Sequence, residues 1–524
     1  MTARSQSFVA AVSLAALPLS AQGILPLVES GDALPAGTVS FVDRIDVTSD
    51  GGWLAHVYCS DTKRQALVRD GAVLVQAGDP VPGIPGAVYD LFGTTDLGAG
   101  GHVAIQSSYA DLGPKTALHL DGALVGTQGT PVGAPQLPPG TAWHVVDGAR
   151  VNASGLMLAH GFTGVLGSTA PLLVKLDPSA GFAADAVAWP GQILPGQTQP
   201  VDAFFPYAGF VDLNDAGQVL FTPHVATAGF ALYLDGALLA QEGAPSPVAG
   251  FNWATFAGLD LDNHGGWVVA ALLRDAANDP LWTIVRNGAV FAKVGDVLPA
   301  TAPHALTDLG GALGADDGTL AWVGEWNGRA VLSVDQLPIL ELGTTQIAGK
   351  TVFKLLDFAR DDSGRFLAVA VYFDDTTYGA YLIDLTGGAT TPVPGCAPSG
   401  ATLSTAGGAS PSIGQTLDLA LDGAQAPGAL SFAAIASQPA SAGPCGVIVP
   451  GVGEVLISLA PPNPLVTLPG PTWTGAAVTI PVAVPPVGAL VGDTFFAQGL
   501  FLDAGGASGE PLRLTTGLAL DVGV

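Results

Sequence analysis

Histidine is the residue type best suited to acid–base chemistry near neutral pH, and three histidines of this 524-residue chain occupy related positions. His56 and His160 lie five residues after a turn glycine, and His224 lies seven residues after one. Odd offsets have the same parity on a β-strand, so these side chains should project to the same side of their strands. Together they would bind a metal ion or transfer protons. We favour the alternative that each is hydrogen-bonded separately between sheets, because they belong to different repeats.

Carboxylates and imidazoles near the ends of predicted strands form a second candidate set. Its members are Asp202, Asp212, Asp260, His264, His304 and Asp308. If they converge, they would supply the general acid and base of an extracellular hydrolase or lyase. The sequence contains no Gly-x-Ser-x-Gly, His-Glu-x-x-His, phosphate-loop or Cys-x-x-Cys motif that would identify a catalytic site by itself.

Two acidic turns, residues 212–217 (DLNDAG) and 260–265 (DLDNHG), partly resemble calcium-binding loops. Calcium takes six to eight oxygen ligands, and such loops supply a further carboxylate downstream. Apolar residues follow both turns instead, so we interpret them as structural turns and keep calcium as the alternative. No other cofactor is expected.

Tryptophans near predicted loops could stack on sugar rings. The candidates are Trp143, Trp189, Trp253 and Trp326. The alternative is that they pack in the core or against the loops.

Seven repeats of about 50 residues must position all of these side chains. Each repeat begins with a glycine, continues with a polar turn ending in glycine, and closes with an Asp or Asn turn after an apolar strand. The Asp or Asn residues of these closing turns are Asp70, Asp121, Asp177, Asp235, Asn287, Asp335 and Asp384. Asp-Gly or Asn-Gly at this point predicts a two-residue hairpin, in which both residues need positive φ. Four strands per unit is the period of a β-propeller blade, so we predict an all-β chain with a seven-bladed β-propeller.

The propeller is assigned to residues 24–390, and residues 24–29 (ILPLVE) are predicted to complete its seventh blade. They match the fourth strands of other repeats, whereas the seventh repeat has no convincing fourth strand. The alternative is an unpaired arm. Residues 391–398 are assigned to a linker, and residues 399–524 to an antiparallel, Ig-like β-sandwich, because alternating apolar runs recur through them.

This layout resembles a family of bacterial secreted repeat propellers that carry a short, Cys-containing C-terminal β-sandwich. The resemblance rests on the repeat period and the order of the domains, and it includes no catalytic motif. It implies export and a role at or outside the cell surface, and it transfers no functional residues.

The first residues predict export. Residues 1–21 combine a short basic start, an apolar stretch and small residues, as a signal peptide does. Pro18 and Pro26 disfavour the alternative of an uncleaved anchor. Two later charge-free stretches, 423–453 and 455–492, are broken by proline and glycine, so no other membrane span is predicted.

The cysteines indicate the redox compartment, and the net charge restricts the classes of partner. Cys396 and Cys445 are predicted to form a disulfide in an oxidising compartment, and Cys59 is expected to be a buried, inert thiol. The 17 basic and 44 acidic residues give a net charge of -27, which repels polyanions, so nucleic acid is excluded as a partner.

Two functions follow from these observations. The favoured one is a secreted or cell-surface, non-catalytic scaffold or binding protein that presents loops to a glycan or protein partner. The alternative is an extracellular polysaccharide hydrolase or lyase with its site at one mouth of the propeller. Propellers support both binding and catalysis, so fold class does not choose between them.

Overall fold

The computed structural model describes residues 24–523 with short gaps. The gaps are residues 111–113, 166–167, 205–209, 299–302, 386–387, 394, 397–400, 413–414, 424–427, 441–444, 450–451, 460–464, 485–493 and 504–511. The predicted signal peptide, residues 1–21, lies outside the described residues. Within them the chain is all-β, as predicted, and helical structure is confined to short 3-10 turns such as Pro178–Ala180 and Ala406–Gly408. The described part contains no helix with the length and apolar character needed to cross a bilayer.

Seven antiparallel sheets, numbered here in chain order, precede residue 386. Sheet 1 contains β2 (Ala33–Leu34), β3 (Gly37–Val47), β4 (Trp53–Cys59), β5 (Arg64–Arg69) and β6 (Ala72–Gln76). Sheet 2 contains β7 (Val88–Leu97), β8 (Val103–Ala110), β9 (Pro114–Leu120) and β10 (Ala123–Thr127). Sheet 3 contains β11 (Trp143–Val151), β12 (Met157–Val165), β13 (Ser168–Asp177) and β14 (Ala183–Ala188).

The remaining four sheets repeat this order. Sheet 4 contains β15 (Val201–Phe204), β16 (Val211–Leu213), β17 (Val219–Phe221), β18 (Pro223–Val225), β19 (Gly229–Leu234) and β20 (Ala237–Gln241). Sheet 5 contains β21 (Phe251–Leu261), β22 (Trp267–Asp275), β23 (Pro280–Arg286) and β24 (Ala289–Lys293). Sheet 6 contains β25 (Leu306–Gly314), β26 (Leu320–Trp326), β27 (Arg329–Val334) and β28 (Leu337–Glu341). Sheet 7 contains β29 (Gln346–Ile347), β30 (Lys350–Arg360), β31 (Phe366–Phe373), β32 (Tyr378–Asp384) and β1 (Ile24–Glu29).

The predicted two-residue hairpin turns are confirmed. Asp70 and Gly71, between β5 and β6, have φ of 49° and 81°. The aspartate has a second role, because its Oδ1 accepts a hydrogen bond from Trp53 N at 2.8 Å. Asp121 does the same for Val103 N at 2.9 Å, so this turn residue also fixes the start of the second strand of its sheet.

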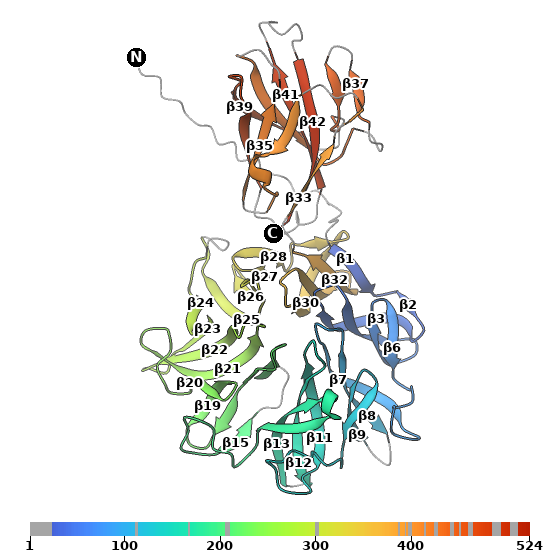
Figure 1. Ribbon diagram of the computed structural model, residues 1–524, viewed down its shortest axis with the longest axis vertical. Coiled ribbons are helices and arrows are strands. Elements are labelled where there is room, and N and C mark those ends of the chain that lie inside the picture. Colours follow the sequence, from blue (N-terminus) through green and yellow to red (C-terminus); the bar gives the residue numbers. More distant parts are fainter. Residues whose placement is uncertain are drawn as a thin grey trace.

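The N-terminal strand belongs to the last of the seven sheets. β1 pairs antiparallel with β32, from Ile24 opposite Ile383 to Glu29 opposite Gly379. This is the pairing that the sequence predicts for residues 24–29. Figure 1 shows the seven sheets arranged about a common centre, with β1 beside β32.

Hydrophobic cores lie between neighbouring sheets. Leu54 and Leu67 of sheet 1 pack with Tyr89 and Phe92 of sheet 2, for example. Sheets 7 and 1 are joined in the same way, because Phe366 packs with residues of β3 and β4. Each sheet is therefore stabilised mainly by its two neighbours.

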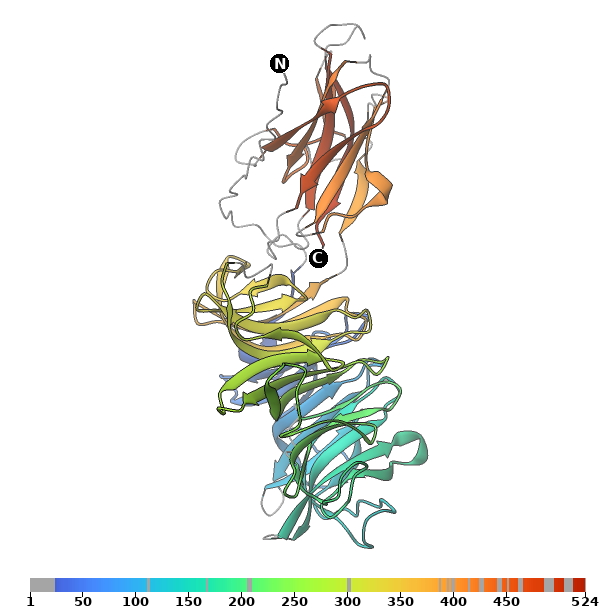
Figure 2. The same cartoon turned by 90° about the vertical axis from the view of Figure 1, so that its left-hand side faces the viewer.

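Two further sheets and a hairpin follow. A five-stranded sheet contains β33 (Ala389–Val393), β42 (Leu512–Asp521), β41 (Thr494–Leu502), β36 (Leu430–Ala436) and β39 (Leu465–Thr472). A three-stranded sheet contains β34 (Thr402–Thr405), β35 (Thr416–Asp422) and β40 (Val478–Ala483), and the hairpin contains β37 (Val447–Val449) and β38 (Gly453–Val455). Leu419 and Ile480 share one core with Ala433 and Phe501 of the larger sheet. Figure 2 shows these strands and the seven sheets at opposite ends of the long axis.

The boundary between the two parts differs from the predicted one. Residues 389–393, assigned to the end of the propeller and the start of a linker, form β33, which pairs with β42 of the C-terminal sheet. Pro392 lacks a backbone N–H donor, which is unfavourable inside a sheet. Because β33 is at the edge of its sheet, the missing donor breaks no internal pairing.

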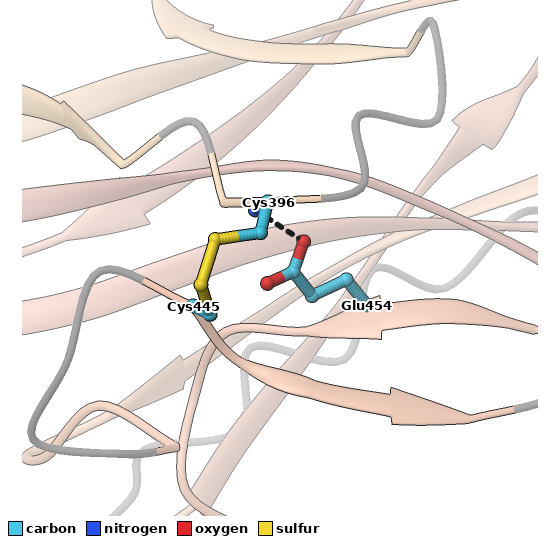
Figure 3. Close-up of side chains that lie close together, drawn as sticks. All are labelled: Cys396, Cys445 and Glu454. Carbon is cyan, nitrogen blue, oxygen red and sulfur yellow. Dashed lines mark hydrogen bonds between the residues drawn. A yellow bond between two sulfur atoms is a disulfide. The ribbon is translucent and has the colours of Figure 1, made fainter.

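The predicted disulfide between Cys396 and Cys445 is present. Beside it lies the buried carboxylate of Glu454, which accepts hydrogen bonds from Cys396 N at 2.7 Å and Gly446 N at 2.6 Å. Figure 3 shows Glu454 directed at the segment that carries Cys396. The disulfide and Glu454 together hold the segment after β33 against the β37–β38 hairpin. Cys59 is a free, buried thiol whose pKa is raised by burial and by Asp61, as expected of an inert cysteine.

Candidate functional site

One cavity of about 680 Å³ is lined by residues from all seven sheets, and we call it the central cavity. Its lining comes from one strand of each sheet, which we call the inner strand, and from the turn that follows it. The inner strands are β3, β7, β11, β16, β21, β25 and β30. These strands surround the centre of the seven sheets in Figure 1. The cavity is therefore the place where residues far apart in the sequence come together.

Acidic residues dominate this lining. Nine aspartates and three arginines line it: Asp43, Asp46, Asp96, Asp212, Asp215, Asp260, Asp262, Asp357, Asp362, Arg44, Arg150 and Arg360. Five of them stand five residues before a turn glycine in five consecutive repeats: Asp46, Asp96, Arg150, Asp212 and Asp260. Sheets 6 and 7 have Leu313 and Ala359 at this position. Sheet 7 contributes Asp357, Arg360 and Asp362 from other positions, so sheet 6 is the one sheet without a charged residue in the lining.

Four aspartates of the inner strands connect neighbouring sheets. In each case a carboxylate oxygen accepts a hydrogen bond from a backbone N–H on the inner strand of the following sheet. The pairs are Asp96 with Val151 N at 2.6 Å, Asp212 with Leu261 N at 2.7 Å, Asp260 with Gly314 N at 2.5 Å, and Asp357 with Ile45 N at 3.1 Å. The last pair joins sheet 7 to sheet 1. These carboxylates thus hold the sheets together and also give the cavity its charge.

Several carboxylates that line the central cavity have raised pKa values. Burial, followed by repulsion from Asp96 and Asp357, raises the pKa of Asp46 well above its usual range. Burial and the charge of Asp212 do the same for Asp260. Burial raises the pKa of Asp357 to about 6. Burial is the largest cause of each shift, and repulsion between the carboxylates adds to it, so a bound cation would lower all of these pKa values.

Arg150 is the main cation among these acids. Its Nη1 donates to Asp96 at 2.8 Å, and its Nε lies 3.8 Å from Asp212. Burial opposes its charge, but Asp96 and Asp212 raise its pKa. Burial and this guanidinium together lower the pKa of the neighbouring His160 to about 4, so that imidazole is neutral at physiological pH.

The raised pKa of Asp357 predicts a dependence of stability on pH. Folding raises the value from 3.8 to about 6, so the native state binds this proton more tightly than the unfolded chain. The resulting stabilisation is complete below pH 3.8 and is lost as the pH rises through about 6. Asp357→Asn keeps the acceptor for Ile45 N and removes the titration. We expect this variant to be more stable than the wild type at pH 8 by about 1 to 3 kcal/mol, to keep about half of that advantage at pH 5, and to lose it only below pH 3.8.

Urea unfolding of both proteins from pH 5 to pH 8 measures this difference. Asp90→Asn is the control, because Asp90 is an exposed aspartate of β7 outside the central cavity. An Asp357→Asn profile parallel to that of the wild type would contradict the assignment.

Of the predicted acid and histidine candidates, the structure brings Asp212 and Asp260 together in the central cavity. Asp202 contacts His224 at 2.6 Å on sheet 4, outside the residues that line the cavity. His304 and Asp308 are exposed at the start of sheet 6. His264 is exposed on the turn after β21, with its Nδ1 3.7 Å from Asp316. The six residues therefore do not form a single site.

The three histidines of the repeats lie on three different sheets. His56 of β4 has its Nδ1 2.8 Å from Asp43, and His160 of β12 is buried. His224 of β18 contacts Asp202. Each has its own surroundings, and the structure does not gather them into one metal or acid–base centre.

Three of the four tryptophans proposed to stack on sugars are buried, and that prediction is corrected. Trp143, Trp253 and Trp326 are 4%, 6% and 8% exposed, so they have no free ring face. Each stands at an end of a strand, β11, β21 or β26, where the sequence suggests a loop but the ring points into the inter-sheet core. Trp189, just after β14, is half-buried and packs against the core of sheet 3.

The two calcium-like turns connect sheets. Asp215 Oδ1 accepts from Ala153 N at 2.6 Å, and Asn263 Oδ1 accepts from Asp215 N at 2.8 Å. Asp262 Oδ1 accepts from Gly266 N within its own turn at 2.6 Å. These bonds fit the interpretation as structural turns, and calcium stays the alternative.

Sequence reasoning missed Asp46, Asp96, Arg150 and Asp357. For the first three a signal was present, since a charged residue recurs five positions before the turn glycine in five successive repeats. Counting backwards from that glycine, as was done forwards for the histidines, would have found them. Asp357 stands two positions earlier than this series, so no repeated pattern marks it.

Comparisons with known proteins complete the description of the site. No protein-family model matches the chain, and a search of curated proteins finds no match.

Proposed function

We propose that the chain is a secreted or cell-surface, non-catalytic binding protein whose seven sheets form a seven-bladed β-propeller. Residues 399–524 would form the C-terminal β-sandwich. The pairing of β1 with β32 and the contribution of all seven inner strands to one cavity support this architecture. The burial of Trp143, Trp253 and Trp326 argues against glycan binding through loop tryptophans. We therefore propose the central cavity as the binding site.

The ligand that we propose for this cavity is positively charged, and it would come from outside the cell as a free molecule or as part of a glycan or protein. The observation that carries the proposal is the lining, with nine aspartates against three arginines. Asp46 and Asp260 have raised pKa values because they are buried close to other carboxylates. A cation among them would relieve this repulsion without moving the sheets.

Isothermal titration of residues 22–524 with putrescine, calcium chloride and an uncharged oligosaccharide tests this function. We expect a cation to bind and the oligosaccharide not to bind. Asp260→Asn keeps the acceptor for Gly314 N but removes charge, and it should weaken cation binding about tenfold. Asp90→Asn removes the same charge from an exposed site and should have no effect. Binding of the oligosaccharide alone, or equal effects of the two variants, would overturn the proposal.

A second candidate is a polysaccharide hydrolase or lyase in the same cavity. The pKa of Asp260 is raised well above its usual range while that of neighbouring Asp212 is raised less, and acid–base catalysis uses two carboxylates in different protonation states. Incubation with polysaccharides, followed by an assay for new chain ends, separates the candidates. Chain ends that Asp260→Asn abolishes would establish catalysis.

A further inference from the structure

A second cavity, of about 280 Å³, lies between sheets 6 and 7, and we call it the apolar pocket. Its walls include Val323, Leu332, Leu342, Leu355 and Phe358. Asp357 is the one ionisable residue in its lining. An apolar cavity of about 150 Å³ is already large enough to bind benzene. The apolar pocket is therefore large enough for a sizeable hydrocarbon group.

Two consecutive glycines of β25 create this space. At Gly310 and Gly311 the pairing of β25 with β26 shifts register, between Leu309 and Ala312. Neither glycine carries a side chain that could fill the gap between the sheets. A Cβ at Gly311 would meet Phe358 at an ordinary contact distance of 3.8 Å, so the site has room for added atoms.

The apolar pocket and the central cavity are adjacent and share part of their lining. Gly311, Leu356, Asp357 and Phe358 line both. A ligand could therefore place one end among the apolar walls and the other among the aspartates. The Asp357 carboxylate stands at the junction, where it would meet the charged end of such a ligand.

We propose that the two cavities together bind an organic cation that carries an apolar chain, of which a primary alkylammonium ion is the simplest example. The ammonium group would lie by Asp357 in the acidic central cavity, and the alkyl chain would occupy the apolar pocket. The aspartates would repel a carboxylate with the same alkyl chain. A neutral alcohol with that chain would bind without the attraction between the ammonium group and the aspartates. This inference rests on the proposed function and names the class of ligand.

Titration with alkylamines of increasing length tests the inference on residues 22–524. We expect the Kd to fall about fourfold for each added methylene from butylamine to octylamine, as burial of one methylene predicts. Octanol should bind at least tenfold more weakly than octylamine, and octanoate should not bind. A Kd that does not depend on chain length, or octanol that binds as well as octylamine, would overturn the inference.

Gly311→Leu provides the structural control, because the leucine side chain would fill the apolar pocket. We expect octylamine then to bind no better than butylamine. Gly311→Ala adds a smaller group and should weaken octylamine binding severalfold, which keeps the test decisive if the leucine variant does not fold. Ala237→Leu also introduces a leucine, at an exposed position of β20, and should leave the chain-length dependence unchanged.

Putrescine separates this inference from the proposed function. Putrescine binding that Asp260→Asn weakens, without any chain-length effect among the alkylamines, would refute the amphipathic ligand and leave the cationic site in place. Failure of the alkylamines, putrescine and calcium all to bind would refute both.

Discussion

A chain that begins at Ser30 is expected to unfold about 10 °C below one that begins at Gln22, because it lacks β1. β1 supplies the outermost strand of sheet 7 and pairs with β32 along its length. Val28 is 3% exposed within the core of sheets 7 and 1, and Tyr381 donates a hydrogen bond to Glu29. Loss of these backbone bonds and of this apolar burial amounts to about 5 kcal/mol.

Thermal unfolding of the two chains measures this effect, and two point variants localise it. Val28→Ala should destabilise the chain, since Val28 is buried, whereas Leu25→Ala should change little because Leu25 is 58% exposed. If residues 24–29 were an unpaired arm, the truncated chain and both point variants would unfold at the same temperature as the parent.

Replacement of Cys396 and Cys445 by serine is expected to destabilise the C-terminal sheets by about 4 kcal/mol. The two cysteines are 49 residues apart, and the disulfide restricts the unfolded chain over that length. Its loss also frees the β37–β38 hairpin from the segment after β33, so that Glu454 alone would hold them together. We expect the seven sheets of this variant to have the same stability as those of the parent chain.

Calorimetry measures the unfolding of both parts of the chain, and Trp473 fluorescence serves as a local reporter of the C-terminal sheets. Trp473 is the only tryptophan after residue 394 in the sequence, and its ring packs edge-on against Phe501 with a centroid distance of 5.1 Å. Cys59→Ser is the control, since Cys59 is a free cysteine buried in sheet 1. That variant should lower the stability of the seven sheets and leave the environment of Trp473 unchanged. Equal effects of the serine pair on both parts of the chain would contradict this assignment.

Local chemistry explains which features the sequence could predict. The Asp70-Gly71 turn needs only two residues with positive φ, and the strand at 24–29 resembles other fourth strands, so both were recognisable from short segments. The disulfide followed from two cysteines within one domain. The first two features depend on residues that are neighbours in the sequence, and the disulfide depends on the number of cysteines in the domain.

The central cavity depends on contacts between distant repeats, which short patterns do not record. Asp357 accepts from Ile45 N across 312 residues, and its position matches no other aspartate in the repeats. Trp143 and Trp253 adjoin loops in the sequence, yet their rings point into cores that the adjacent sheets complete. Whether a residue near a strand end faces solvent or a neighbouring sheet is decided by packing between the sheets.

The pairing of β1 with β32 also has a consequence for the order of folding. Ile24 is made early and Ile383 more than 350 residues later, so the first strand must wait for nearly the whole series of sheets before it finds its partner. A pairing of such long range is slow, because the intervening chain must first be ordered. Until then β1 and β32 each present an unpaired edge, and the growing chain depends on keeping both edges apart from other chains. The pairing of β1 with β32 is therefore the folding step most exposed to aggregation.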